Sequence, residues 1–167
     1  MQKITPYLWF DHQAEEAAQL YVDVFNGRPT ERTLTPSRIV EVSRYGEAGP
    51  GTPGSAMIVS FELEGQAFTA LNGGPHHQFT EAVSFLVHCE GQKEVDHFWD
   101  ALIAEGGEES MCGWLKDRFG LSWQIVPGRL MELLGDPDPG RSQRAMQAML
   151  QMRKIDIAEL ERAAEAA

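Results

Sequence analysis

The strongest constraint on the fold is a repeated order of predicted elements. An apolar strand, an amphipathic helix and further strands occur twice, offset by about half of the 167-residue chain. Residues 4–10 predict the first strand, and Asp11 is the predicted cap of the helix that follows it. Apolar residues at helical spacing continue until Gly27. Residues 82–89 and 92–105 repeat the strand and the helix. This order predicts an α+β fold in which each module packs its helix on one face of a sheet.

The segments between and after these elements complete two modules and a tail. Strands are predicted at 56–64 and 67–72, joined by a tight turn at Gly65 and Gln66, and a last strand at 121–126. The Gly- and Pro-rich residues 46–55 predict a connecting loop or, as the alternative, a lid over a site. We therefore divide a single domain, 1–167, into modules at 1–74 and 80–127 and a helical tail at 128–167.

The tail has an amphipathic, Met-rich pattern that requires a surface to cover. Asp156 and Glu159 have the spacing of a capping box, which predicts the start of a final helix. The tail either covers its own module or a second subunit, and we expect a homodimer.

The charge balance excludes two classes of partner. The chain has 25 acidic and 14 basic residues, for a formal net charge of −11. Such a surface repels nucleic acid and anionic lipid, so we expect neither partner and retain neutral or cationic small molecules. No stretch has the pattern of a signal peptide or a membrane span, and Cys89 and Cys112 lack metal-binding spacing. We expect a cytoplasmic protein with reduced thiols.

Four segments carry a family resemblance. Residues 6–10 with 14–17, 70–75, 112–127 and 152–157 are similar to the PhnB-like family, which is catalogued as 3-demethylubiquinone-9 3-methyltransferase domains. The resemblance implies paired βαβββ modules of the glyoxalase, bleomycin-resistance and dioxygenase superfamily, also called the vicinal-oxygen-chelate fold. It also implies dimers and a cup-shaped pocket in each curved sheet. It implies no single reaction, because that superfamily contains several enzymes as well as binding proteins.

The resemblance also implies where a metal would be held. Enzymes of the superfamily bind a divalent metal through His, Gln or Glu on the first and last strands of each module. Among the corresponding positions of this chain only Gln124 offers such a side chain, and a cation requires several donors. We therefore predict no metal and no other cofactor. The positions fall near Thr5, Phe68 or Ala70, Val83 or Ser84, and Gln124.

Aromatic side chains on the predicted strands indicate a ligand pocket. An aromatic cup with a few polar groups is the usual form of a small-molecule site, whereas the alternative for each aromatic residue is core packing. The adjacent His76 and His77 are interpreted as solvated loop residues, and Cys112 as structural. The candidate lining residues are Trp9, Phe68, Asn72, Phe85, His88, Trp114, Trp123 and Gln124.

Three functions remain open. The first is a metal-free protein that binds a small hydrophobic molecule. The second is a metal-dependent lyase, isomerase or dioxygenase of the superfamily. The third is a methyltransferase, although the strand–helix junction at 10–14 lacks the glycines that S-adenosylmethionine sites use.

Overall fold

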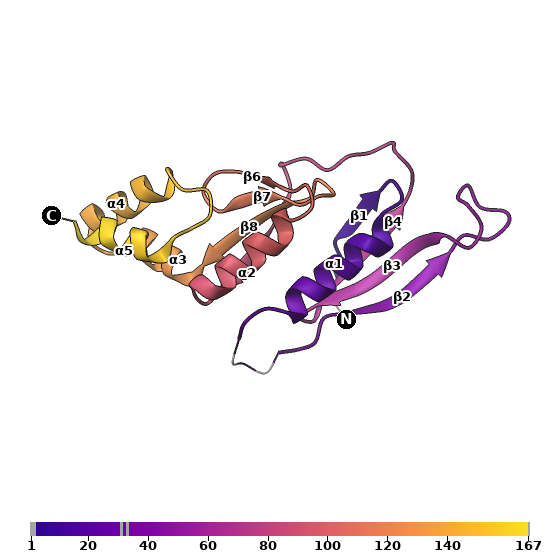
Figure 1. Cartoon of the computed structure of the whole chain (residues 1–167), viewed down its shortest axis with the longest axis horizontal. Helices are drawn as coiled ribbons and strands as arrows, with labels where there is room; N and C mark the ends of the chain where they lie inside the picture. The colour runs from indigo at the N-terminus through magenta and orange to yellow at the C-terminus, as the bar shows by residue number, and fades with distance from the viewer. Residues whose placement is uncertain (1–2, 31, 33, 167) are drawn as a thin grey trace. The chain divides into compact units, whose positions relative to one another are not determined.

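The computed structural model describes residues 3–30, 32 and 34–166. The chain divides into two compact units, Met1–Phe79 and Thr80–Ala167, which we call the first and the second unit and describe separately (Figure 1). No helix in these described ranges is both long and apolar enough to cross a membrane.

The first unit contains one helix and a four-stranded sheet. The strands are ordered β1-β4-β3-β2, with β1 parallel to β4 and the other pairs antiparallel. Its elements are β1 (Tyr7–Phe10), α1 (Ala14–Asn26), β2 (Arg38–Arg44), β3 (Ala56–Leu63) and β4 (Gln66–Asn72).

The second unit repeats this arrangement and adds three helices. Its sheet is ordered β5-β8-β7-β6, with β5 parallel to β8, so the predicted repeat and the α+β class are confirmed. Its elements are β5 (Ser84–Cys89), α2 (Gln92–Ile103), β6 (Glu108–Glu109), β7 (Trp114–Lys116), β8 (Ser122–Pro127), α3 (Gly128–Leu134), α4 (Pro139–Met149) and α5 (Ile157–Glu165).

Helix α1 covers one face of the first sheet. The ring of Tyr21 on α1 lies 6.2 Å from that of Phe61 on β3, which stacks at 5.2 Å on Phe68 of β4. All three side chains are buried. Because side chains alternate along a strand, neighbouring residues such as Trp9 and Thr69 face the other side. We call the sheet face opposite the helix of its own unit the open face.

Helix α2 covers one face of the second sheet in the same way. Phe98 and Trp99 of α2 are buried, and so are Leu115, Trp123 and Ile125, which occupy alternate positions on the strands. The intervening residues of β5, β7 and β8 therefore belong to the open face.

The C-terminal helices form a core of their own against the end of β8. Their buried face packs on Val126, so the tail covers part of its own unit, while the homodimer stays a prediction. The buried residues of this cluster are Val126, Leu130, Leu133, Ala145, Met152, Ile155, Leu160 and Ala164. Asp156 caps α5 as predicted, because its side chain accepts from the N–H of Glu159 at 2.9 Å.

Two local predictions need correction. The β3–β4 turn is formed by Glu64 and Gly65, which have φ values of 49° and 85°, whereas Gln66 already pairs with Leu63. Positive φ at both central residues is what a tight type I′ hairpin requires. Asp11 does not cap α1: the cap position is Gln13, which makes no side-chain cap, and a residue of β4 supplies the acceptor instead.

Candidate functional site

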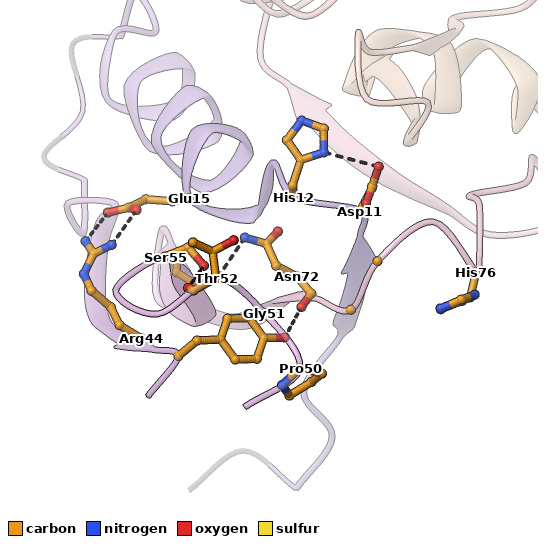
Figure 2. A pocket seen from close by; sticks show the side chains of 14 residues that line it. Asp11, His12, Glu15, Arg44, Pro50, Gly51, Thr52, Ser55, Asn72 and His76 are labelled. Carbon is orange, nitrogen blue, oxygen red and sulfur yellow. Dashed lines mark hydrogen bonds and ion pairs between the residues drawn. The ribbon is translucent and has the colours of Figure 1, made fainter. Parts of the chain in front are cut away.

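A pocket of about 610 Å³ lies within the first unit (Figure 2). Three segments that are distant in sequence form it: the start of α1, the end of β2 with the loop into β3, and the end of β4. Its volume is in the range of small-molecule sites. The lining residues are Asp11, His12, Glu15, Arg44, Tyr45, Pro50, Gly51, Thr52, Ser55, Ala56, Asn72, Gly73, Gly74 and His76.

Asn72 holds the walls of this pocket together. Its Oδ1 accepts from the N–H of Ala14 at 2.8 Å, and its Nδ2 donates to the carbonyl of Ala56 at 3.0 Å. The Tyr45 hydroxyl donates to the backbone carbonyl of Asn72 at 2.6 Å. Asn72 thus lies in the pocket wall, but its amide is already engaged in joining α1, β3 and β4.

The loop at 46–55 is packed onto Tyr45. A Cβ on Gly51 would lie 2.3 Å from the Tyr45 ring, so the backbone passes directly over the aromatic face. The N–H of Gly54 donates to the Tyr45 carbonyl at 2.8 Å. The segment for which we predicted a loop or a lid therefore forms one wall of the pocket.

The charged groups of the pocket pair with one another. The Arg44 guanidinium donates to both Glu15 carboxylate oxygens, at 2.9 and 3.3 Å, and Asp11 lies 3.2 Å from the His12 ring. Figure 2 shows both pairs among the lining side chains. A ligand here would meet hydroxyl, imidazole and backbone groups, so the pocket suits a polar molecule better than a hydrophobic one.

The open face of the second sheet carries a different set of groups. Trp114, Gln124 and Leu86 are direct neighbours across β7, β8 and β5. Trp114 and Gln124 are half-buried, and Leu86 is 42% exposed. The Gln124 amide is oriented by donating to the Ser84 hydroxyl at 2.8 Å. This row presents an aromatic, an amide and an aliphatic side chain side by side.

The next set of cross-strand neighbours on this face includes a charged group. Lys116 binds Glu108 at 3.1 Å and Glu81 at 3.2 Å. Hydrogen bonds to these two carboxylates raise the pKa of Lys116, so it stays protonated at neutral pH. Its charge is balanced locally, and the row adds no net positive potential to the open face.

Ser122 lies beside Lys116 and Ser84 in the same row. It is only 1% exposed, yet its hydroxyl has no hydrogen-bond partner among the described residues. A buried polar group without a partner destabilises the fold, because no hydrogen bond offsets the loss of its contact with water.

Two matched alanine substitutions test this description of Ser122. We expect Ser122→Ala to raise the free energy of unfolding by about 1 kcal/mol, because it removes an unsatisfied buried hydroxyl. Ser84→Ala should lower it by about 1 kcal/mol, because the Gln124 amide loses its acceptor. Urea unfolding followed by circular dichroism measures both. Equal losses in the two variants would show that Ser122 does have a partner.

The remaining predicted lining residues separate by face. Trp9 is on the open face of the first sheet, where its Nε1 donates to the Gly74 carbonyl at 2.9 Å and its ring contacts that of His77 edge-on at 4.8 Å. His88, which is exposed, lies on the open face of the second sheet. Trp9 and His88 therefore belong to the sheets of different units.

Three of the predicted lining residues point toward the helices instead. Phe68 is buried in the core under α1. Phe85 pairs with Trp123, and their rings lie 5.7 Å apart on the face that α2 covers. Their assignment to a pocket was wrong. They occupy the alternate strand positions whose side chains face the helix, and so they have the other predicted role, core packing.

Of the site residues that the sequence analysis did not name, some had a signal in the sequence and others had none. Ser122 and Lys116 could have been found, because alternation from Gln124 and Trp114 places them on the same face. Arg44 and Tyr45 could not, because nothing local indicates that the end of β2 meets the start of α1.

The positions of the superfamily metal ligands do not fit a cation within either unit. On β4 the open-face residue is Thr69, since Phe68 and Ala70 face α1, and on β5 it is Ser84. Across residues 3–30, 32 and 34–166, no group of three or more His, Cys, Asp or Glu side chains is placed to hold a metal ion. Hydroxyls and one amide are poor ligands for divalent metals without carboxylate or imidazole partners.

Comparison with known proteins identifies the family. The family model for 3-demethylubiquinone-9 3-methyltransferase matches residues 2–126. The chain belongs to this family. A PhnB protein from Bacillus cereus is 35% identical to this PhnB-like chain, with a TM-score of 0.65, over 76% of this chain and 100% of that one. No curated protein matches the sequence significantly.

Two more distant structures share the fold. Protein PA1353 from Pseudomonas aeruginosa is 22% identical with a TM-score of 0.55, over 76% of the PhnB-like chain and 98% of its own. The fosfomycin resistance protein FosX from Listeria monocytogenes is 14% identical with a TM-score of 0.50, over 79% and 97%. These likenesses establish the glyoxalase and bleomycin-resistance fold that the resemblance implied.

The family match ends at Val126. Helices α3, α4 and α5 lie beyond it, and so do residues 152–157, which we had included in the resemblance. The C-terminal helices are therefore an addition to the part of the chain that the family model describes.

Proposed function

We propose that this PhnB-like protein binds a small, mainly hydrophobic molecule on the open face of its second sheet, without a metal. The observation that carries the proposal is the row of Trp114, Gln124 and Leu86, in which an aromatic surface and an oriented amide remain accessible. Apolar and aromatic surface with few placed polar groups is the usual composition of a small-molecule site.

The polar groups of the row restrict the ligand further. Gln124 uses its Nε2 on Ser84, and its carbonyl oxygen accepts no hydrogen bond from the described residues. An aromatic ligand that carries a hydroxyl or N–H group would stack on Trp114 and donate to this oxygen. The net charge of −11 favours neutral and cationic ligands over anions.

Trp114→Ala tests the site directly. Naphthol, naphthylmethylamine and naphthoate present one aromatic ring system in neutral, cationic and anionic forms, and isothermal titration calorimetry measures their binding. We expect the first two to bind the intact protein and Trp114→Ala to weaken them about tenfold or more, because a stacking aromatic contributes about 1–3 kcal/mol. Met131→Ala, at a side chain 55% exposed on α3, is the matched control and should leave affinity unchanged.

The possible outcomes separate this site from the pocket of the first unit. Equal binding by the intact protein and Trp114→Ala would contradict the open-face site and favour the 610 Å³ pocket, whose paired charges suit a more polar ligand. Binding of naphthoate alone would contradict the charge argument.

Two enzymatic alternatives remain to be tested against the binding proposal. The family description names a methyl transfer, but residues 11–13, which join β1 and α1, contain no glycine. Saturable binding of S-adenosylmethionine in calorimetry would replace our proposal with a methyltransferase. Stoichiometric zinc, iron, manganese or nickel in the purified protein would replace it with a metal-dependent enzyme.

A further inference from the structure

The segment 152–157, which leads from α4 to the first residue of α5, contacts two other parts of the second unit. We call it the strap. Its Met152 and Arg153 carbonyls accept from the N–H groups of Cys112 and Gly113 at 2.7 and 2.8 Å. Cys112 and Gly113 form the turn that leads into β7. The strap thus pairs with the backbone just before Trp114.

The turn that the strap holds has an unfavourable backbone. Cys112 has a φ of 60° and Gly113 a φ of 82°. A non-glycine residue in the left-handed region costs free energy and persists only where its surroundings fix it. A Cβ on Gly113 would lie 3.2 Å from the Ile155 side chain, which is fully buried, so the strap also packs against the turn.

The strap is anchored on α2 as well. Gln92 donates from Nε2 to the Ile155 carbonyl at 3.0 Å and accepts at Oε1 from the Ile157 N–H at 2.9 Å. Lys154 forms ion pairs with Asp96 at 3.0 Å and Asp100 at 3.5 Å. These contacts hold the strap along α2, from Gln92 to Asp100.

We infer that the strap is a positioning element for the ligand face, in which the C-terminal helices hold the turn at Cys112 and Gly113 and thereby set the orientation of Trp114. The inference rests on the proposed function for its effect on binding. A continuous series of contacts joins Gln92 to the strap and the strap to the turn. The Gly113 carbonyl then accepts from the Ile125 N–H at 2.7 Å, which joins the turn to β8 beside Gln124. The strap lies beyond the residues that the family model matches.

The test compares Gln92→Ala with Arg144→Ala in the full-length protein. The first variant releases the strap from α2. The second removes a contact inside the tail, where the Arg144 guanidinium donates to the Ala164 carbonyl at 2.7 Å, and leaves the strap untouched. Both loosen the C-terminal helices, but only the first acts on the turn.

Fluorine NMR of protein labelled with fluorotryptophan reports on Trp114 without any ligand. We expect Gln92→Ala to shift or broaden the Trp114 resonance and to speed amide hydrogen exchange at Cys112 and Gly113, while Trp9 in the first unit is unchanged. Arg144→Ala should leave all of these signals as they are. Naphthol affinity should fall about tenfold in Gln92→Ala only.

The readouts keep the two proposals distinct. An unchanged Trp114 resonance together with faster exchange at Cys112 would overturn the inference, since the strap would then be released without consequence. If the intact protein binds none of the naphthyl probes, the proposed function fails, while the resonance and exchange data still decide the positioning role. If Gln92→Ala does not fold, Arg153→Ala, which breaks only the 3.3 Å ion pair of the strap with Glu109, repeats the test with a milder change.

Discussion

Asp117→Ala is expected to lower the free energy of unfolding by about 3–5 kcal/mol, one of the largest effects of any single substitution in the chain. Asp117 is 3% exposed. Its Oδ1 accepts from the N–H groups of Phe119 and Leu121 at 2.9 and 3.1 Å, and its Oδ2 accepts from Trp123 Nε1 at 2.9 Å. Alanine would leave three buried donors without an acceptor.

Urea unfolding measured by circular dichroism provides the number. Asp117→Asn keeps one acceptor oxygen and should give an intermediate loss. The control is Asp138→Ala, which removes an exposed carboxylate that caps α4 by accepting from the Gly140 N–H, and it should cost only about 1 kcal/mol. A loss no greater than that of the control would mean that water reaches the donors around Asp117.

Phe61→Ala is expected to cost about 3–5 kcal/mol in the first unit. The Phe61 side chain is 1% exposed and lies between the rings of Tyr21 and Phe68 at the contact of α1 with the sheet. The substitution would leave a cavity there that the neighbouring side chains fill only in part.

Ser60→Ala on the same strand is the control for Phe61. Ser60 is half-buried, and its position on β3 directs its side chain to the open face. Ser60→Ala should therefore change the free energy of unfolding by no more than about 0.5 kcal/mol. The same unfolding assay compares the two variants. Similar losses in both would contradict the assignment of the two faces of β3.

The sequence predicted the elements well because their signals are local. The helix at 14–26 has small and apolar residues on one face, and the final helix has an aspartate at its cap, so neither depends on distant residues. The doubled strand–helix order is the sum of these local signals, and the α+β class follows from that order.

Which side chains of each strand point to the buried face was harder to predict. In β4 the pair Phe68 and Ala70 alternates with Thr69 and Leu71, so each face has an apolar residue and hydrophobicity alone does not assign the buried side. In β8, Val126 is buried under the tail although it has open-face parity. The prediction named aromatic strand residues without deciding which face each one occupies, and for this reason Phe68 and Trp123 were assigned to a pocket although they face the helices.

The candidate sites required information that no local pattern contains. The pocket of the first unit forms where the ends of β2 and β4 meet the start of α1, and Tyr45 and Gly51 have no sequence signal that joins them to Asp11. Trp114 was found as an aromatic residue on a predicted strand, and Gln124 because it occupies a metal-ligand position that the family resemblance implies. Residues 152–157 were noted for their family resemblance, but their contacts with the turn at Cys112 were not predicted, since a short segment between two helices has no periodicity.

The capping of α1 by Asn72 has a consequence for the order in which the first unit can be built. The acceptor for the N–H of Ala14 is 58 positions further along the chain. While the protein is being synthesised, the opening turn of this helix lacks its partner until β4 has left the ribosome and paired with β1. The earliest helix in the chain therefore becomes complete only when the last strand of its unit arrives.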